Sequence, residues 1–328
     1  MEPSGSAPAA QPSSGEGAAV KWTGQTRGGV FGNWFFLKLI LLLGPRAAYA
    51  WLVPVAAYFT VASPRSFRMS VQFLRRVLGP RPLWKWPLLV YRHFFTFGVT
   101  LLDRSAAIMG RGHFQCRYEG EDLFKAHFER REGIILLGAH VGAWEMGGQL
   151  LSRYGIPVNF VMLEQEEQRV RRMLDRHLQN KQFRILTADG SPLRSVPIAA
   201  ALRRGEIVAL HGDRTFGGAS VTVPFLGADA LFPIGAYVLA SATGAPVFQV
   251  FAVRERLGRY RFFSFPALQV PRGLDPRKPE SFKAYAGLYA ERLAAVARQY
   301  PFQWQNFYPF WDGREEPAQG RERRVIRR

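Results

Sequence analysis

The stretch Gly133–Ala139, which reads GIILLGA, is followed directly by the polar segment HVGAWE at residues 140–145. A short, continuous apolar run of this kind is typical of a strand buried on both faces of a parallel sheet. The run IVAL at 207–210 repeats the pattern, because the polar segment HGDR follows it at 211–214. Parallel strands end at one edge of a sheet, where α/β folds bind ligands, so we expect both polar segments at that edge.

Strand and helix patterns alternate on both sides of these two runs. This alternation predicts an α/β fold, with a largely parallel sheet and helices on both of its faces. We expect further strands at 157–162 and 183–186, helices at 143–153, 164–181, 196–204, 233–243 and 279–299, and a hairpin of strands 246–254 and 259–265.

The N-terminal part of the chain has a different composition. Residues 1–20 are rich in Ala, Gly, Pro and Ser and predict a disordered tail. Two apolar runs follow, at 30–44 and 47–62, and each is shorter than the roughly 20 residues that a membrane-spanning helix needs. We therefore expect 21–110 to be a hydrophobic, basic, helical segment that attaches to a membrane. A kinked span, a hairpin dipping into one leaflet and a buried helical pair all fit these runs.

The formal net charge of +19 indicates an anionic partner. Nucleic acid, an anionic membrane surface and an acidic protein all satisfy the charge, but the sequence carries no nucleic-acid-binding motif. No acidic residue lies between Glu16 and Asp103, and basic residues flank the apolar runs there. This pattern favours a membrane surface over nucleic acid. The rest of the chain divides into an α/β domain at 111–312 and a charged tail at 313–328.

His140 and Glu145 are the first candidates for chemistry. In a continuous helix, side chains five positions apart point about 140° apart, so the two cooperate only if His140 lies in the turn before the helix. Gly142 would relax the backbone of such a turn. A histidine held by a carboxylate is a general base, and the absence of a nearby Ser, Cys or Thr favours direct deprotonation of an acceptor over a covalent intermediate. The alternative is an ordinary polar turn.

Asp213 and Arg214 form the second candidate pair. They could bind a phosphate or position an acyl carbonyl, or they could form a structural ion pair at a turn. A metal site is not expected, because the histidines lack zinc-ligand spacing. The single cysteine, Cys116, leaves no thiolate cage and no disulfide within the chain.

The HVGAWE segment resembles the H-x4-D/E block of the bacterial lipid A biosynthesis acyltransferase family. That family includes lauroyl and myristoyl transferases and the mycobacterial phosphatidylinositol mannoside acyltransferase. The segments GDR (212–214), VPFLG (223–227), FPIGAYVLASATGAPV (232–247) and WQNFYPFW (304–311) follow in the order that the family shows. The resemblance covers about residues 30–312.

The resemblance implies a sheet of about seven strands and a location at the cytoplasmic face of the inner membrane. It implies an acyl-carrier-protein or acyl-CoA donor and a lipid or glycolipid acceptor, and we expect no cofactor. His140 would be the general base, with Glu145 orienting it, and the later blocks would supply substrate-binding residues: Asp213, Arg214, Phe225, Gly227 and Pro233.

The region between the two clusters departs from the family pattern. Residues 163–174 are unusually charged, and 177–191 lack the block rich in Arg and Asn that lipid A enzymes often carry. The acceptor therefore stays open among lipid A, an amino lipid, a glycolipid and an aryl lipid. The alternative function is a non-catalytic, membrane-associated lipid-binding protein of the same fold.

Overall fold

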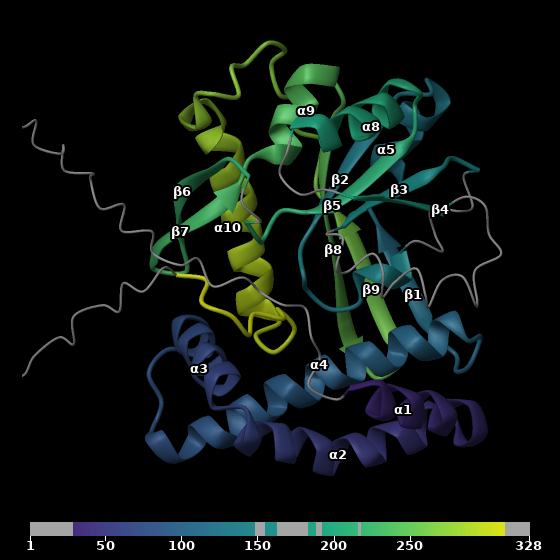
Figure 1. Ribbon diagram of the computed structural model, residues 1–328, viewed down its shortest axis with the longest axis vertical. Coiled ribbons are helices and arrows are strands. Elements are labelled where there is room, and N and C mark those ends of the chain that lie inside the picture. The colour runs from purple at the N-terminus through teal and green to yellow at the C-terminus, as the bar shows by residue number, and fades with distance from the viewer. Residues whose placement is uncertain (1–28, 148–154, 163–182, 188–191, 216–217, 312–328) are drawn as a thin grey trace, which may run out of the picture.

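The computed structural model describes residues 29–147, 155–162, 183–187, 192–215 and 218–311. At its centre lies a seven-stranded sheet with the strand order β1-β9-β8-β2-β5-β3-β4 (Figure 1). Neighbouring strands are parallel except β8 and β9, which form an antiparallel hairpin, so the predicted mixed α/β sheet is confirmed. The strands are β1 (Gln115–Glu119), β2 (Ile134–Gly138), β3 (Val158–Met162), β4 (Phe183–Thr187), β5 (Ile207–His211), β8 (Val247–Arg256) and β9 (Arg259–Ser264).

The strand β2 is buried along its whole length, as its apolar sequence predicts. Ile135 and Leu137 point into the large core that includes α8 (Pro192–Arg203), α9 (Gly235–Thr243) and α10 (Lys283–Gln299). Ile134 and Leu136 point to the opposite face, where they pack with Phe124 of α5 (Asp122–Glu129). The alternation of side chains along a strand therefore explains why a strand covered on both faces reads as a continuous apolar run.

The N-terminal helices form a separate layer along one end of the sheet (Figure 1). They are α1 (Gly29–Leu43), α2 (Pro45–Ala62), α3 (Pro64–Leu78) and α4 (Trp86–Ile108), with the 3-10 turn η1 (Leu83–Lys85) before α4. Within the described residues, no single helix is long and apolar enough to cross a membrane. The pair α2 and α3, bent by 95°, passes that test of length and composition together.

Three predicted helices differ from the structure or lie outside its described part. The helix expected from Pro233 begins at Gly235, because Pro233 ends β7 (Ala228–Pro233), which pairs antiparallel with β6 (Ser220–Phe225) in a hairpin that we did not predict. The described part of the helix expected at 143–153 is a 3-10 turn, η2 (Trp144–Gly147). The helix expected at 164–181 lies outside the described residues, as do the two predicted tails.

The remaining predicted helices are confirmed with shifted starts. The helix expected at 196–204 begins at Pro192, and the one expected at 279–299 consists of the 3-10 turn η4 (Pro279–Phe282) followed by α10. The hairpin of β8 and β9 turns at Leu257 and Gly258, as predicted. The described segment after α10 returns to the ends of β2 and β5, where it contacts His140 and Asp213.

Candidate active site

The pairing of β2 with β5 joins the two polar segments. Gly138 lies opposite His211 in the parallel register, so the residues that follow each strand meet at one edge of the sheet. There, Nδ1 of His140 lies 2.8 Å from Oδ1 of Asp213. The backbone N–H of His140 donates to Oδ2 of the same carboxylate at 3.0 Å. The histidine ring and its own backbone are thus fixed by one acidic side chain.

The protonation of this pair follows from its partners. Asp213 is only 1% exposed. Although burial alone would raise the pKa of Asp213, the charge and hydrogen bond of His140, with the Arg214 guanidinium nearby, hold that pKa well below its usual range. A carboxylate can only accept, so Nδ1 of His140 carries a proton, and loss of the other ring proton leaves the free lone pair on Nε2. This is the arrangement of a general base.

The segment after α10 closes around the pair. The indole N–H of Trp304 donates to Oδ2 of Asp213 at 2.9 Å, and the Tyr308 hydroxyl donates to the Asp213 carbonyl at 3.0 Å. The Gln305 backbone N–H donates to the His140 carbonyl at 2.8 Å, and its side-chain amide donates to the Gly142 carbonyl at 3.0 Å. Sequence reasoning used these residues only for the family resemblance. The dense mixture of aromatic and amide side chains in this segment was the sequence feature that could have marked them as site residues.

Gly142 has the role that the sequence suggested for it. Its φ of 57° lies in the left-handed region, which favours glycine. A Cβ atom at this position would lie 2.0 Å from the carbonyl oxygen of Ala252 in β8, which is impossible without moving the backbone. The turn that carries His140 away from β2 is therefore possible only with glycine at this position.

A second imidazole lies beside the first. The ring centroid of His211 is 4.1 Å from that of His140, and the Trp144 ring meets His211 edge-on at 4.3 Å. Burial, and then the charge of His140, lowers the pKa of His211 well below its usual value. His211 therefore stays neutral when a proton moves onto His140.

The other predicted site residues differ in their positions relative to the His140–Asp213 pair. The backbone of Glu145 lies in η2, and its side chain is outside the described part of the structure. Arg214 donates to the Gln305 carbonyl at 3.1 Å and lies over the Tyr308 ring, so it braces the segment that closes the site. Phe225 is a core residue behind Trp304, with ring centroids 5.3 Å apart. Gly227 forms the β6–β7 turn and Pro233 ends β7, so these two residues belong to the hairpin.

Comparison with known proteins shows the family to which this chain belongs. A family model described as bacterial lipid A biosynthesis acyltransferase matches residues 25–312. The phosphatidylinositol mannoside acyltransferases of two Mycobacterium tuberculosis strains are 26% identical to the chain over 194 residues, a match that spans 58% of this chain and 58% of each relative. A crystal structure of the 1-acyl-sn-glycerophosphate acyltransferase from Thermotoga maritima aligns with 14% identity and a TM-score of 0.36, over 76% of this chain and 95% of that one. The chain belongs to the bacterial lipid A biosynthesis acyltransferase family.

Proposed function

We propose that the protein transfers a fatty acyl chain from an acyl-carrier-protein or acyl-CoA thioester to a hydroxyl or amine of a lipid or glycolipid. Family membership supports acyl transfer in lipid biosynthesis. The observation that carries the mechanism is the 2.8 Å contact between His140 Nδ1 and Asp213 Oδ1, which leaves Nε2 as the proton acceptor. Glu145 keeps the orienting role that the H-x4-E spacing predicts.

In the proposed reaction, Nε2 of His140 takes the proton from the acceptor as its oxygen or nitrogen attacks the thioester carbonyl. The negative charge of Asp213 stabilises the imidazolium that forms, and its hydrogen bond keeps the ring in position. The tetrahedral intermediate collapses by breaking the C–S bond, and the departing thiolate takes the proton back from His140. The acyl group passes directly to the acceptor, without an acyl-enzyme.

The direct test compares His140→Ala with His127→Ala in the purified full-length chain. His127 is a matched control, because its Nδ1 also contacts a carboxylate, Glu132, at 2.6 Å, but away from the site. Palmitoyl thioesters of acyl carrier protein and of CoA are each offered with a phosphatidylinositol mannoside or a lipid A precursor, and product is measured by mass spectrometry. We expect His140→Ala to lose at least about 100-fold in rate and His127→Ala to keep wild-type turnover. Equal turnover of the two variants would exclude the mechanism.

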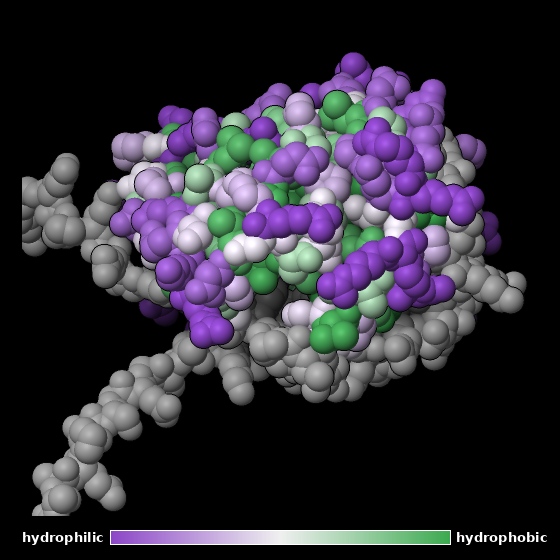
Figure 2. All heavy atoms as spheres, turned by 90° about the horizontal axis from the view of Figure 1, so that it is seen from above, coloured by the Kyte–Doolittle hydropathy of each residue, from purple (hydrophilic) through white to green (hydrophobic). Residues whose placement is uncertain are grey.

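We further propose that the N-terminal helices dock on the cytoplasmic face of the inner membrane, where both kinds of thioester are available. Large apolar side chains are exposed along this layer, among them Leu42, Trp51, Tyr58, Trp84 and Leu88. Soluble proteins rarely leave so many exposed apolar side chains within one layer of helices, unless a partner covers them. The opposite end of the molecule shows hydrophilic side chains interspersed with apolar ones (Figure 2).

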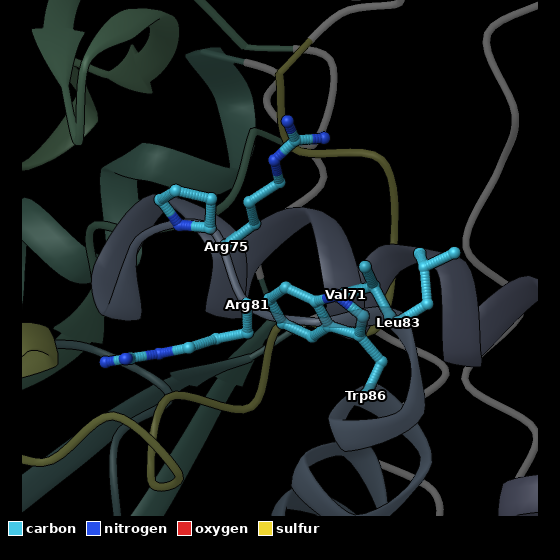
Figure 3. A pocket seen from close by; sticks show the side chains of 6 residues that line it. Val71, Arg75, Arg81, Leu83 and Trp86 are labelled. Atoms are coloured by element: carbon cyan, nitrogen blue, oxygen red, sulfur yellow. The ribbon is translucent and has the colours of Figure 1, made fainter.

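Basic residues accompany this apolar layer. A shallow pocket of about 240 Å³ between α3 and α4 is lined by Val71, Arg75, Pro80, Arg81, Leu83 and Trp86. Figure 3 shows that the Arg75 and Arg81 side chains extend to different sides of its apolar floor. Cations beside the exposed Leu83 side chain match an interface where acyl chains and anionic headgroups meet.

Flotation with phosphatidylglycerol vesicles tests the docking. We expect the double variant Trp51→Glu, Leu88→Glu to lose vesicle binding, because it puts two charges on the apolar layer. Val196→Glu is the control, since Val196 is also exposed but lies on α8, away from that layer. Vesicle binding of the double variant that equals that of the control would refute the docking surface.

A further inference from the structure

Trp304 makes two buried hydrogen bonds, which join it to two different parts of the molecule. Its indole N–H donates to Oδ2 of Asp213 at 2.9 Å. Its backbone carbonyl lies 2.9 Å from Nε2 of His93, a fully buried histidine in α4. His93 Nδ1 in turn lies 2.7 Å from the hydroxyl of Ser70, a buried residue in α3. One residue thus lies between the N-terminal helices and the carboxylate of the site.

The direction of each bond in this chain is fixed by chemistry. A carbonyl oxygen can only accept, so Nε2 of His93 carries the proton and Nδ1 accepts from the Ser70 hydroxyl. Burial lowers the pKa of His93 to about 4, which keeps the ring neutral at neutral pH. The anchor of Trp304 is therefore a set of uncharged, fully paired groups.

We propose that Trp304 is a positioning residue for the His140–Asp213 pair, anchored to α3 and α4 through His93 and Ser70. The inference rests on the proposed function, because it assigns a role within the same site. Oδ2 of Asp213 accepts from the His140 backbone and from Trp304, while Oδ1 faces the His140 ring. Without the indole donor, one hydrogen bond fewer holds the Asp213 carboxylate in its orientation. Because Asp213 is only 1% exposed, water has little access to replace that donor.

The sequence offers a matched control for this role. Trp311 is also fully buried, and its indole N–H also donates to an oxygen, the Phe225 carbonyl, at 3.1 Å. The two indole rings lie in one aromatic cluster, 6.1 Å apart. Trp304→Phe and Trp311→Phe therefore remove the same chemical group from the same core, and only the first removes it from Asp213.

The experiment measures kcat, KM and the pH dependence of kcat in both full-length variants, with the palmitoyl thioester and acceptor on which the wild type turns over. We expect Trp304→Phe to lower kcat about 10- to 100-fold, with KM changed less than about threefold. We expect Trp311→Phe to stay within about twofold of wild type in both.

The pH profile separates positioning from general damage to the fold. Asp213 is faced by His140, His211, Arg214, Tyr289 and Tyr308, and the indole takes part of its negative charge by hydrogen bonding. Without that donor, the carboxylate stabilises the protonated His140 ring more strongly. The acidic limb of the Trp304→Phe profile should therefore move to higher pH, whereas that of Trp311→Phe should not move.

His93 supplies a second route if Trp304→Phe does not fold. His93→Phe fits the surrounding Phe73 and Phe307 rings but removes the donor to the Trp304 carbonyl. His93→Gln places an amide N–H near the position of Nε2 and should restore most of the turnover that His93→Phe loses. Equal kcat in Trp304→Phe and Trp311→Phe, or in His93→Phe and wild type, would overturn the inference. A wild type without turnover would instead count against the proposed function.

Discussion

Two buried aspartates, Asp213 at the strand ends and Asp103 in α4, show how partners decide what a carboxylate does. Both are almost fully buried, at 1% and 0% exposure. Asp213 accepts from the His140 ring and the Trp304 indole. Asp103 instead accepts from two tyrosine hydroxyls, Tyr49 of α2 and Tyr260 of β9.

The pKa values of the two carboxyls move in opposite directions. Burial raises the pKa of Asp103, and the two hydroxyls and the nearby Arg254 only partly offset this. The pKa of Asp213 is held low, because the charge of His140 and the Arg214 guanidinium outweigh the effect of burial. A carboxylate that must stabilise an imidazolium has to stay ionised, so Asp213 suits chemistry. Asp103 joins α2, α4 and β9, which suits a role in attaching the N-terminal helices to the sheet.

The largest expected effect is that of Asp213→Asn on turnover. The amide removes the charge that stabilises the protonated His140 ring, and its N–H can donate to Nδ1, which reverses the tautomer of the imidazole. We expect kcat to fall by about 10³- to 10⁴-fold while the variant still unfolds cooperatively. Steady-state kinetics and circular dichroism on the same preparation measure both. A loss of less than tenfold would mean that Asp213 is structural, like Asp103.

Asp103→Leu should produce the opposite pattern. The substitution keeps the branched shape of the side chain but leaves the Tyr49 and Tyr260 hydroxyls without their acceptor. Leaving one buried and one partly buried hydroxyl without an acceptor should lower the free energy of unfolding by about 3 kcal/mol. Urea titration measures this, and kcat of the folded fraction should stay within about threefold of wild type. A large loss of kcat with unchanged stability would remove the contrast between the two aspartates.

The smallest effect is on the pH dependence of stability. An unfolded Asp titrates near pH 3.9. Because the folded pKa of Asp213 is lower, the unfolded state binds its proton first, and the stability from Asp213 is lost as pH falls below about 4. For Asp103 the folded pKa is higher, so its contribution declines as pH rises from about 4 through that folded pKa.

The two asparagine variants isolate these slopes. In wild type, Asp103 makes the stability fall as the pH rises above 4, and Asp103→Asn should remove that fall. Asp213 makes the stability rise as the pH rises toward 4, and Asp213→Asn should remove that rise. Urea unfolding between pH 3 and 7 gives the free energies. Slopes of the same sign for both aspartates would contradict the opposite pKa shifts.

Local pattern predicted the sheet and the edge at which the site lies. The apolar runs of β2 and β5 can be recognised as strands from their own residues, because a strand buried on both faces must be apolar throughout. The hairpin of β6 and β7 was missed for a related reason. It exposes alternate residues, so its pattern is weaker, and the sequence predicts Pro233 as the first residue of a helix, whereas it is the last residue of a strand.

The partners of His140 could not be predicted from local pattern. Asp213 lies 73 positions further along the chain, and its contact with the ring depends on the register of Gly138 with His211. Trp304 reaches Asp213 only because the segment after α10 returns to the ends of these strands. The H-x4-E spacing indicates Glu145, the acid close in sequence, as the partner of His140. In the structure, Asp213 contacts the His140 ring.

The measurement that tests the central claim most directly is the protonation of the His140 ring. Two-bond ¹H–¹⁵N NMR spectra of the full-length protein, assigned by comparison with His140→Ala, distinguish the two ring nitrogens at neutral pH. If Asp213 holds the ring as a general base, Nδ1 carries the proton and Nε2 has the ¹⁵N shift of an unprotonated nitrogen. A protonated Nε2 with a bare Nδ1 would contradict the account, because the ring would then present a donor and not a base to the acceptor.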